Sequence, residues 1–246
     1  MKYRFRSSQL STLLDGCGKV INKLEWKNLD KISDAHIKLA IEVFNATRGF
    51  TPYSWNSLDM HAGVEHEPEA VRMLDKLRNT NYYEEYKRVR DAKKPFDKSN
   101  EYTTGTRDVG GDFETLDTKV STDKNVFDLK RFKEMEIKYV VQQNNYGVLY
   151  GTKDLYLANV LMPATYGQIH KMVSSEGYIS MMTDEMKDML QDKLENTYNY
   201  DHLSLDQRIQ VVEVPKIDNF EEIISHRVKL MNKWIEKNLE TKYNTF

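Results

Sequence analysis

The stretch from Glu101 to Ser121 reads EYTTGTRDVGGDFETLDTKVS, and the fold prediction rests on it. Two runs rich in Thr, Tyr, Phe and Val flank Gly110-Gly111-Asp112, which is the composition of two β-strands around a tight turn. A glycine pair followed by Asp supplies residues that readily adopt positive φ, as hairpin turns require. We therefore predict a β-hairpin with Asp108 at the end of its first strand.

The second strand of this hairpin carries the residues that suggest chemistry. Side chains alternate along a strand, so one face holds Phe113, Thr115, Asp117, Lys119 and Ser121, while Leu116 and Val120 face a core. Asp117 and Lys119 can reach one phosphate group, and Asp108 returns beside them across the hairpin. Two converging carboxylates repel unless a cation lies between them, and Mg²⁺ prefers oxygen ligands. Lys119 would hold a phosphate or orient an attacking water. The alternative is a surface hairpin with a solvated Asp–Lys pair.

The order of motifs resembles that of a known nuclease superfamily. Gly105-Thr-Arg-Asp108, a turn, then Leu116-Asp117-Thr118-Lys119 resembles the core motif of the PD-(D/E)xK nucleases, especially RecB-type and lambda-exonuclease-like (YqaJ-type) members. Upstream, the segment GVEHEPEA at 63–70 resembles the family's helix motif, in which an acid follows Gly by four residues. Downstream, QQNNY at 142–146 resembles the RecB-type Gln-x-x-x-Tyr helix. The resemblance covers residues 60–160.

This resemblance implies both a fold and a site. The expected fold is α/β (α+β), with a central mixed β-sheet flanked by helices around a restriction-endonuclease-like core. The expected ligands for Mg²⁺ or Mn²⁺ are Glu67, Asp108 and Asp117. The expected catalytic set adds Lys119, Gln142 and Tyr146. The second acid is Asp rather than the Glu common in lambda-like members, but RecB-type members often use Asp.

Two neighbouring residues compete for these roles. His66 precedes Glu67, and some RecB-type members place a histidine on this helix. Glu67 is favoured because it shares a face with the apolar residues Ala70, Val71, Leu74 and Leu77, where an acid is costly unless paired or metal-bound. Asp112 competes with Asp108, but the chain from Asp112 to Asp117 scarcely allows a turn and two facing strands.

Two segments are candidates for binding nucleic acid. Near the N-terminus lie Arg4, Arg6 and Ser8, where Ser7 or Ser8 could cap a short helix that ends at Gly16. RecB-type nucleases open with a similar helix, whose N-terminus can receive a DNA phosphate; an ordinary capped helix is the alternative. The segment 87–98 carries six cations, interleaved with aromatic residues: Lys87, Arg88, Arg90, Lys93, Lys94 and Lys98. It is either a strand-holding groove or a solvated loop.

Length and composition further restrict the possible fold and function. The chain has 246 residues, 39% hydrophobic and 30% charged, which predicts one globular domain over 1–246 rather than disorder. The net charge of −2 excludes a globally basic DNA binder, so positive charge must be local. The single Cys17 excludes an internal disulfide framework and the four-cysteine iron–sulfur cluster of some RecB-type nucleases. No membrane span or signal peptide is evident, so we expect the cytoplasm of a bacterium or phage-infected cell.

Hydrophobic periodicity predicts the remaining elements. Helices are expected at 33–47, 63–78, 136–150, 164–172, 183–198 and 220–239, and strands at 154–162 and 208–214. In the helix at 183–198, Met186, Met189, Leu190 and Leu194 are interpreted as packing residues.

The expected function is a metal-dependent DNA exonuclease, of the 5′-to-3′ kind that serves phage recombination or repair. In this family, cleavage is an in-line attack without a covalent enzyme intermediate. Expected partners are DNA, a single-strand annealing or single-strand-binding protein, and a second copy of the chain. The alternatives are an endonuclease or Holliday-junction-resolving enzyme on the same fold, and a non-catalytic nucleic-acid-binding protein.

Overall fold

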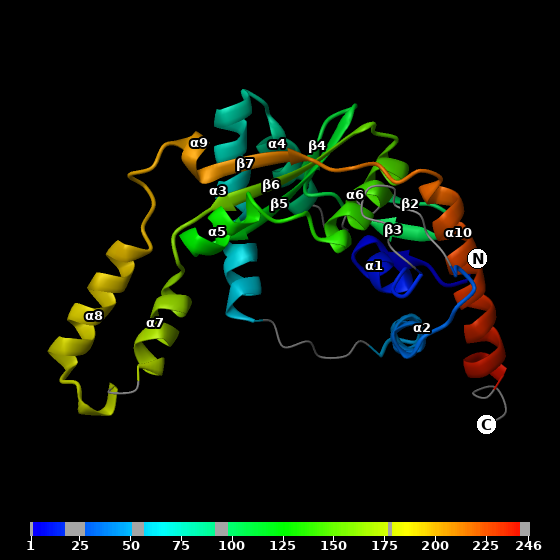
Figure 1. Ribbon diagram of the computed structural model, residues 1–246, viewed down its shortest axis with the longest axis horizontal. Helices are drawn as coiled ribbons and strands as arrows, with labels where there is room; N and C mark the ends of the chain where they lie inside the picture. Colours follow the sequence, from blue (N-terminus) through cyan, green and yellow to red (C-terminus); the bar gives the residue numbers. More distant parts are fainter. Residues whose placement is uncertain (1, 18–27, 51–56, 92–97, 177–178, 242–246) are drawn as a thin grey trace.

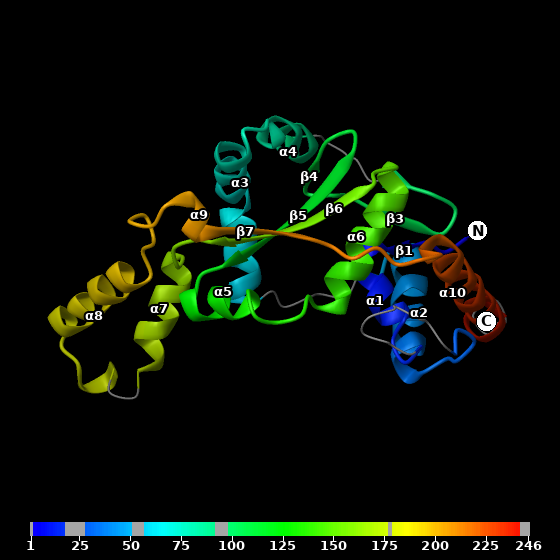
Figure 2. The same ribbon diagram turned by 45° about the horizontal axis from the view of Figure 1, so that its top comes forward.

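The computed structural model describes residues 2–17, 28–50, 57–91, 98–176 and 179–241. In this part of the chain, the larger sheet has the strand order β4-β5-β6-β7. Its strands are β4 (Val109–Gly110), β5 (Glu114–Ser121), β6 (Asp154–Leu161) and β7 (Ile209–Glu213). The β5 and β6 strands are parallel and the other pairs are antiparallel, as Figure 2 shows from above. The predicted mixed sheet flanked by helices is confirmed.

The hairpin is present, but its first strand is much shorter than predicted. Only Val109 and Gly110 pair with β5. The threonine-rich part of the first run forms β3 (Thr103–Gly105), which belongs to a second sheet between β1 (Phe5–Arg6) and β2 (Lys98–Ser99). The chain therefore leaves one sheet and enters the other within the segment that carries Asp108.

The turn of the hairpin does not use positive φ, contrary to the prediction. Neither Gly110 nor Gly111 is among the positive-φ glycines of the described chain. A Cβ on Gly110 would lie 2.7 Å from Nη1 of Arg107 and would also collide with the backbone oxygen of Glu114. The glycine therefore allows close approach of a side chain, which is the second use of this residue type.

Strand β5 is covered on both faces. On the face of Thr115 and Asp117 lies α6 (Ile137–Tyr150), as shown by the 2.8 Å hydrogen bond that the Thr115 hydroxyl donates to Gln143 Oε1. On the opposite face Leu116 is fully buried in a cluster with residues of α3 (Leu58–Arg78) and α4 (Tyr82–Asp91). These covered faces fix which side chains of β5 meet which helix.

Helix α3 begins five residues earlier than predicted because Ser57 caps it and accepts a hydrogen bond from the Met60 N–H. It ends at Asn79, which has left-handed φ. Its buried face contains Ala70, Val71, Met73 and Leu74. The predicted Leu77 is 38% exposed, so its assignment to the core is wrong.

The N- and C-terminal helices pack together beside the smaller sheet (Figure 1). They are α1 (Leu10–Leu13), α2 (Asp34–Thr47) and α10 (Phe220–Ile235), which continues as a π-helical turn, Glu236–Glu240. Buried Arg227 of α10 donates to the backbone oxygens of Leu13, Leu29 and Lys31, and so fastens the N-terminal segments to this helix.

The start of the N-terminal helix differs from the prediction. A 3₁₀ turn, Ser7–Gln9, precedes α1, and Arg6 occupies the N-cap position of that turn. The side-chain oxygen of Gln9 accepts a 2.9 Å hydrogen bond from the Arg6 N–H. Ser7 is buried inside the turn and Ser8 is exposed, so neither serine is the cap. In α2, Ser33 is the N-cap and accepts a hydrogen bond from the His36 N–H; Ile41 is 39% exposed and Val43 is buried.

Helices α7 (Tyr166–Ser175) and α8 (Asp184–Thr197) form an arm at the end of the molecule opposite α10 (Figure 1). Short helices α5 (Lys124–Lys130) and α9 (Leu205–Arg208) lie near its base. No residue of α8 is buried, and Met186 and Met189 are 50% and 68% exposed, so their predicted packing role is wrong. Among the described helices, none combines the length and apolar character that a bilayer span requires.

Candidate active site

Three acidic side chains meet where α3, the start of β4 and β5 come together. Glu67 comes from the middle of α3, Asp108 immediately precedes β4, and Asp117 lies in β5. The Asp108 carboxyl group contacts both of the others. Its Oδ2 accepts a 2.9 Å hydrogen bond from the backbone N–H of Thr118, which fixes it against β5. The structure thus brings together the three acids that the sequence singled out.

Asp117 and Lys119 form the most deeply placed part of this cluster. Asp117 is 1% exposed, and its Oδ2 lies 2.6 Å from Nζ of Lys119. Burial, and then the neighbouring Asp108, raise the pKa of Asp117 to about 8, although Lys119 opposes the shift. Burial would lower the pKa of Lys119, but the charges of Asp117 and Asp108 raise it. The lysine therefore stays charged beside the acids.

Glu67 lies at the other end of the cluster and has two donors of its own. Its side chain is 12% exposed. Its Oε2 accepts a 3.2 Å hydrogen bond from the Tyr86 hydroxyl and pairs with the guanidinium of Arg90. Burial and the charge of Asp108 raise the pKa of Glu67 to about 7, whereas Arg90 and Tyr86 lower it. Both of these donors come from α4.

The donor set of this cluster fits a hard divalent cation. All three groups are carboxylates, the ligand type that such a cation prefers. Burial and then the charge of Asp108 raise the pKa of Glu67 and of Asp117, so a cation placed among these groups would favour their ionised forms. Oδ2 of Asp117 is buried and, despite its contact with Lys119, accepts no hydrogen bond of good geometry. Within the described residues, no three acidic, His or Cys side chains are arranged closely enough to hold a metal ion as they stand. Arg90 holds the Glu67 carboxylate in the arrangement seen here.

Helix α6 supplies the two remaining predicted residues. Gln142 Nε2 donates a 2.9 Å hydrogen bond to the hydroxyl of Tyr146. Tyr146 is 5% exposed, and burial, followed by the charge of Asp117, raises its pKa. The tyrosine therefore stays protonated against the acids, with Gln142 fixing its hydroxyl.

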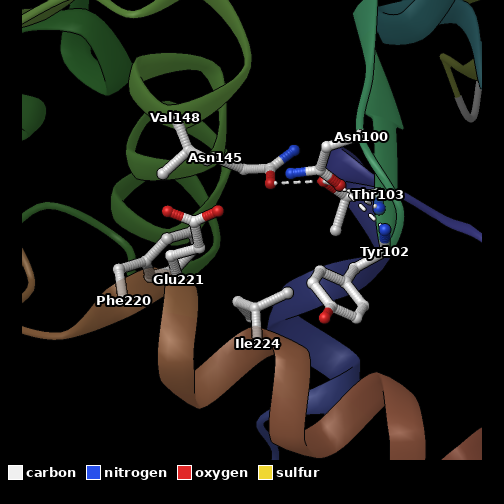
Figure 3. A pocket seen from close by; sticks show the side chains of 8 residues that line it. All are labelled: Asn100, Tyr102, Thr103, Asn145, Val148, Phe220, Glu221 and Ile224. Carbon is white, nitrogen blue, oxygen red and sulfur yellow. Dashed lines mark hydrogen bonds between the residues drawn. The ribbon is translucent and has the colours of Figure 1, made fainter.

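The polar residues between Gln142 and Tyr146 each have a separate partner, which sequence reasoning missed. Gln143 accepts from Thr115, and Asn144 accepts a 2.8 Å hydrogen bond from the backbone N–H of Ile217. Asn145 accepts from Thr103 at 2.9 Å and donates to Ser7 at 2.7 Å. Figure 3 shows Asn145 reaching across to the strand of Thr103, beside a small pocket bordered by α10. These bonds hold α6 to both sheets.

Gly105 also has a structural role of its own that sequence reasoning did not assign. A Cβ at this position would lie 2.8 Å from Cε1 of Tyr146 and would overlap the hydroxyl of Ser7. Glycine is therefore required for β3 to pass this close to the tyrosine. The sequence did mark this position, because Gly105 is the first residue of the Gly-x-x-Asp motif.

His66 and Asp112, the alternatives to Glu67 and Asp108, lie outside the acid cluster. The ring of His66 faces the backbone of Pro163, near Arg208; burial lowers its pKa, and its Nε2 has no hydrogen-bond partner in the described structure. Asp112 is exposed in the hairpin turn. Geometry thus favours Glu67 and Asp108 as the acids of the cluster.

The candidate DNA-binding residues are only partly described. Arg4, Arg6 and Ser8 are exposed at the N-terminus, and Lys87 and Arg88 are exposed on α4. Lys93 and Lys94 lie outside the described residues.

Arg107 is half-buried rather than presented to solvent. Its Nη1 donates to the backbone oxygens of Gly111 and Glu114, both at 3.1 Å, and its Nη2 pairs with Glu85 at 2.9 Å. Arg107 therefore fixes the hairpin against α4.

The mixed sheet flanked by helices, with an acid cluster beside a lysine at the hairpin, is a restriction-endonuclease-like fold that this chain shares with solved exonuclease structures. Among solved structures, a phage-related exonuclease from Haemophilus somnus 129PT superposes with a TM-score of 0.67 and 20% identity, over 97% of this chain and 96% of that one. An alkaline exonuclease (LHK-Exo) from Laribacter hongkongensis, also solved in complex with dAMP, superposes with a TM-score of 0.61 and 10% identity. That match covers 98% of this chain and 92% of the other. No family model and no curated protein matches the sequence. At these identities the likeness establishes the shared fold.

Proposed function

We propose that this chain is a metal-dependent deoxyribonuclease that acts as an exonuclease. The observation that carries the proposal is the contact of Asp108 and Asp117 with each other and with the charged Lys119, in a site also reached by Glu67. The fold shared with two exonucleases supports it. A buried acid cluster with its own cation is a costly arrangement for stability alone, which favours a catalytic use.

Each residue of the cluster has a role in this proposal. Glu67, Asp108 and Asp117 would hold Mg²⁺ or Mn²⁺. A bound divalent ion polarises a phosphate and lowers the pKa of a coordinated water. Lys119 stabilises the negative charge that develops on the phosphate or positions the water. Gln142 orients the Tyr146 hydroxyl, and the tyrosine braces the acids from α6.

The finer activity in this proposal is 5′-to-3′ digestion of linear duplex DNA in phage-type recombination or repair. A single-strand annealing or single-strand-binding protein would then act on the exposed strand. Self-association is a further expectation, which light scattering tests directly.

The test uses linear, circular and single-stranded DNA, each incubated with Mg²⁺, Mn²⁺ or EDTA. We expect cleavage of linear DNA with either metal, none with EDTA, and early release of a label placed at the 5′ end. Cleavage of closed circles would instead establish an endonuclease or junction-resolving enzyme. Binding of DNA without cleavage under every metal condition would contradict the nuclease assignment.

A further inference from the structure

Lys130, the last residue of α5, has a half-buried ammonium group in an unusual environment. Its Nζ donates a 2.7 Å hydrogen bond to the hydroxyl of Ser121. Burial lowers the pKa of this lysine, the charge of Glu136 raises it, and the neighbouring Lys119 and Lys138 lower it further. Across the described residues, no carboxylate forms an ion pair with Lys130. A partly buried cation held by one neutral hydroxyl is unfavourable unless an anion joins it.

The position of Ser121 places Lys130 next to the acid cluster. Ser121 lies two residues beyond Lys119 on the same face of β5, because side chains alternate along a strand. Two residues of strand advance by about 6.6 Å. That step is comparable with the separation of successive phosphates along one nucleic-acid strand. The ammonium of Lys130 therefore places a positive charge about one phosphate spacing beyond Lys119 along β5.

The start of α6 adds to this positive surface. The amines of Lys119 and Lys138 lie 5.1 and 4.7 Å from the centre of the same Tyr139 ring. Lys138 pairs with Glu136 at 2.6 Å and Lys119 pairs with Asp117 at 2.6 Å, whereas Lys130 forms no ion pair of its own among the described residues. The N-cap residue of α6 is Glu136, whose side chain makes no capping hydrogen bond to the first turn and is paired with Lys138 instead.

We propose that Lys130 and Ser121 form a binding subsite for the DNA phosphate adjacent to the one cleaved at Asp117 and Lys119. This inference rests on the proposed nuclease function. The incoming phosphate supplies an ion-pair partner for Lys130, since the nearby carboxylate of Glu136 is already paired with Lys138. The site then engages two successive phosphates, so it favours a polynucleotide strand over a single terminal nucleotide.

Equilibrium binding of a fluorescein-labelled DNA duplex, measured by anisotropy over a KCl series with Ca²⁺ in place of Mg²⁺, tests the subsite. We expect Lys130→Met to weaken binding and to reduce the slope of log Kd against log salt by about 0.9, the value for one duplex phosphate contact. Lys130→Arg should keep the wild-type slope, because the charge remains. Lys133→Met is the matched control, since this lysine is exposed just beyond α5.

A set of duplexes, each with one neutral methylphosphonate linkage near the cleaved end, locates the contact. One linkage next to the cleaved one should weaken binding to the wild type and not weaken it further in Lys130→Met. Equal salt slopes for wild type and Lys130→Met, or equal methylphosphonate penalties in both proteins, would overturn the subsite while leaving cleavage by the wild type unaffected. Lys130-dependent binding by a protein that cleaves nothing would overturn the nuclease function and keep the subsite. Lys130→Arg guards against loss of folding, because it retains both the charge and a donor for Ser121.

Discussion

The guanidinium of Arg90 pairs with the same Glu67 carboxylate oxygen that accepts a hydrogen bond from the Tyr86 hydroxyl. Both donors belong to α4, the helix on which Lys87 and Arg88 are exposed. The helix proposed to contact DNA is therefore joined directly to an acid proposed to bind metal. A divalent ion at Glu67 must compete with the positive charge of Arg90.

Metal titration by calorimetry tests this competition. Glu67→Gln should weaken Mn²⁺ binding by about tenfold or more, a loss typical when a metal site loses one of its supporting groups. Arg90→Met should bind Mn²⁺ more tightly than the wild type, because the competing cation is gone. His66→Ala is the control and should bind normally, since its ring faces Pro163. A larger loss for His66→Ala than for Glu67→Gln would reverse the choice of ligand.

Asp117→Asn and Lys119→Ala should each reduce the rate of DNA cleavage by about 10²–10³-fold at saturating Mg²⁺. The reason is that each removes one preorganised charge at the reacting phosphate. Single-turnover cleavage measures the rate, and circular dichroism confirms that the fold is kept. Turnover near that of the wild type in either folded variant would refute the assignment of these two residues.

The raised pKa values of Glu67 and Asp117 predict how the stability of the metal-free protein depends on pH. The usual values are 4.5 and 3.8, and the folded protein raises them to about 7 and about 8. The folded state therefore binds more protons than the unfolded state across this interval, so its stability falls as pH rises from about 4 to 8. Glu67→Gln and Asp117→Asn should flatten that decline in thermal unfolding midpoints measured in EDTA.

Half-buried His66 and buried His36 have lowered pKa values, so they destabilise the fold at acid pH and oppose this trend. Comparison of each variant with the wild type removes their contribution, because both proteins share it. Mn²⁺ should raise the unfolding midpoint far more at pH 8 than at pH 5. A metal effect that does not change with pH would contradict this account of the acid cluster.

Gly105→Ala should destabilise the protein and slow cleavage, because the added methyl group would displace Tyr146 or Ser7. Overpacking of this kind typically costs about 1–3 kcal/mol. Gly111→Ala is the matched control from the same segment: it has open space around it and φ outside the positive range, so little change is expected. Thermal unfolding and single-turnover cleavage read out both variants. Equal stability of the two would show that β3 can move away from α6 at little cost.

The exposed cations of α4 predict a salt effect on DNA binding. Lys87→Gln with Arg88→Gln should reduce the salt slope of log Kd by about 0.9 per lost duplex phosphate contact. Adding Lys93→Gln and Lys94→Gln should reduce it further, and affinity should fall equally for all DNA sequences. Lys233→Gln with Lys237→Gln, two exposed changes at the C-terminal end, is the control. An unchanged salt slope in the fourfold variant would indicate that the DNA runs elsewhere, past Arg4 and Arg6.

The acids and the lysine of the site could be predicted because local patterns report them. Asp117 and Lys119 alternate with Leu116 along one strand, and Glu67 shares a helix face with Ala70 and Leu74. These periodicities of 2 and 3.6 follow from backbone geometry, so they survive in the sequence whatever the rest of the chain does. The helix at 137–150 follows from the same reasoning, whereas the mixed sheet was expected only from the resemblance to the nuclease superfamily.

The partners of the polar side chains could not be predicted in this way. Thr103 and Ser7 lie 42 and 138 positions from Asn145 along the chain, yet the three residues form one hydrogen-bonded network. Burial also depends on which neighbours arrive: the methionines of α8 show helical spacing, but nothing in the described structure covers Met186 or Met189.

The sequence by itself determined the order of the acids, the lysine and the glutamine along one hairpin and two helices, because strand and helix periods are local properties of the backbone. Only the tertiary structure decided that Asp108 lies between Glu67 and Asp117, that Arg90 reaches Glu67, and that Lys130 reaches Ser121. Those relationships depend on how α3, α4 and α5 pack around β5. Packing is a property of the whole chain, because each helix finds its place only by burying its apolar face against the others.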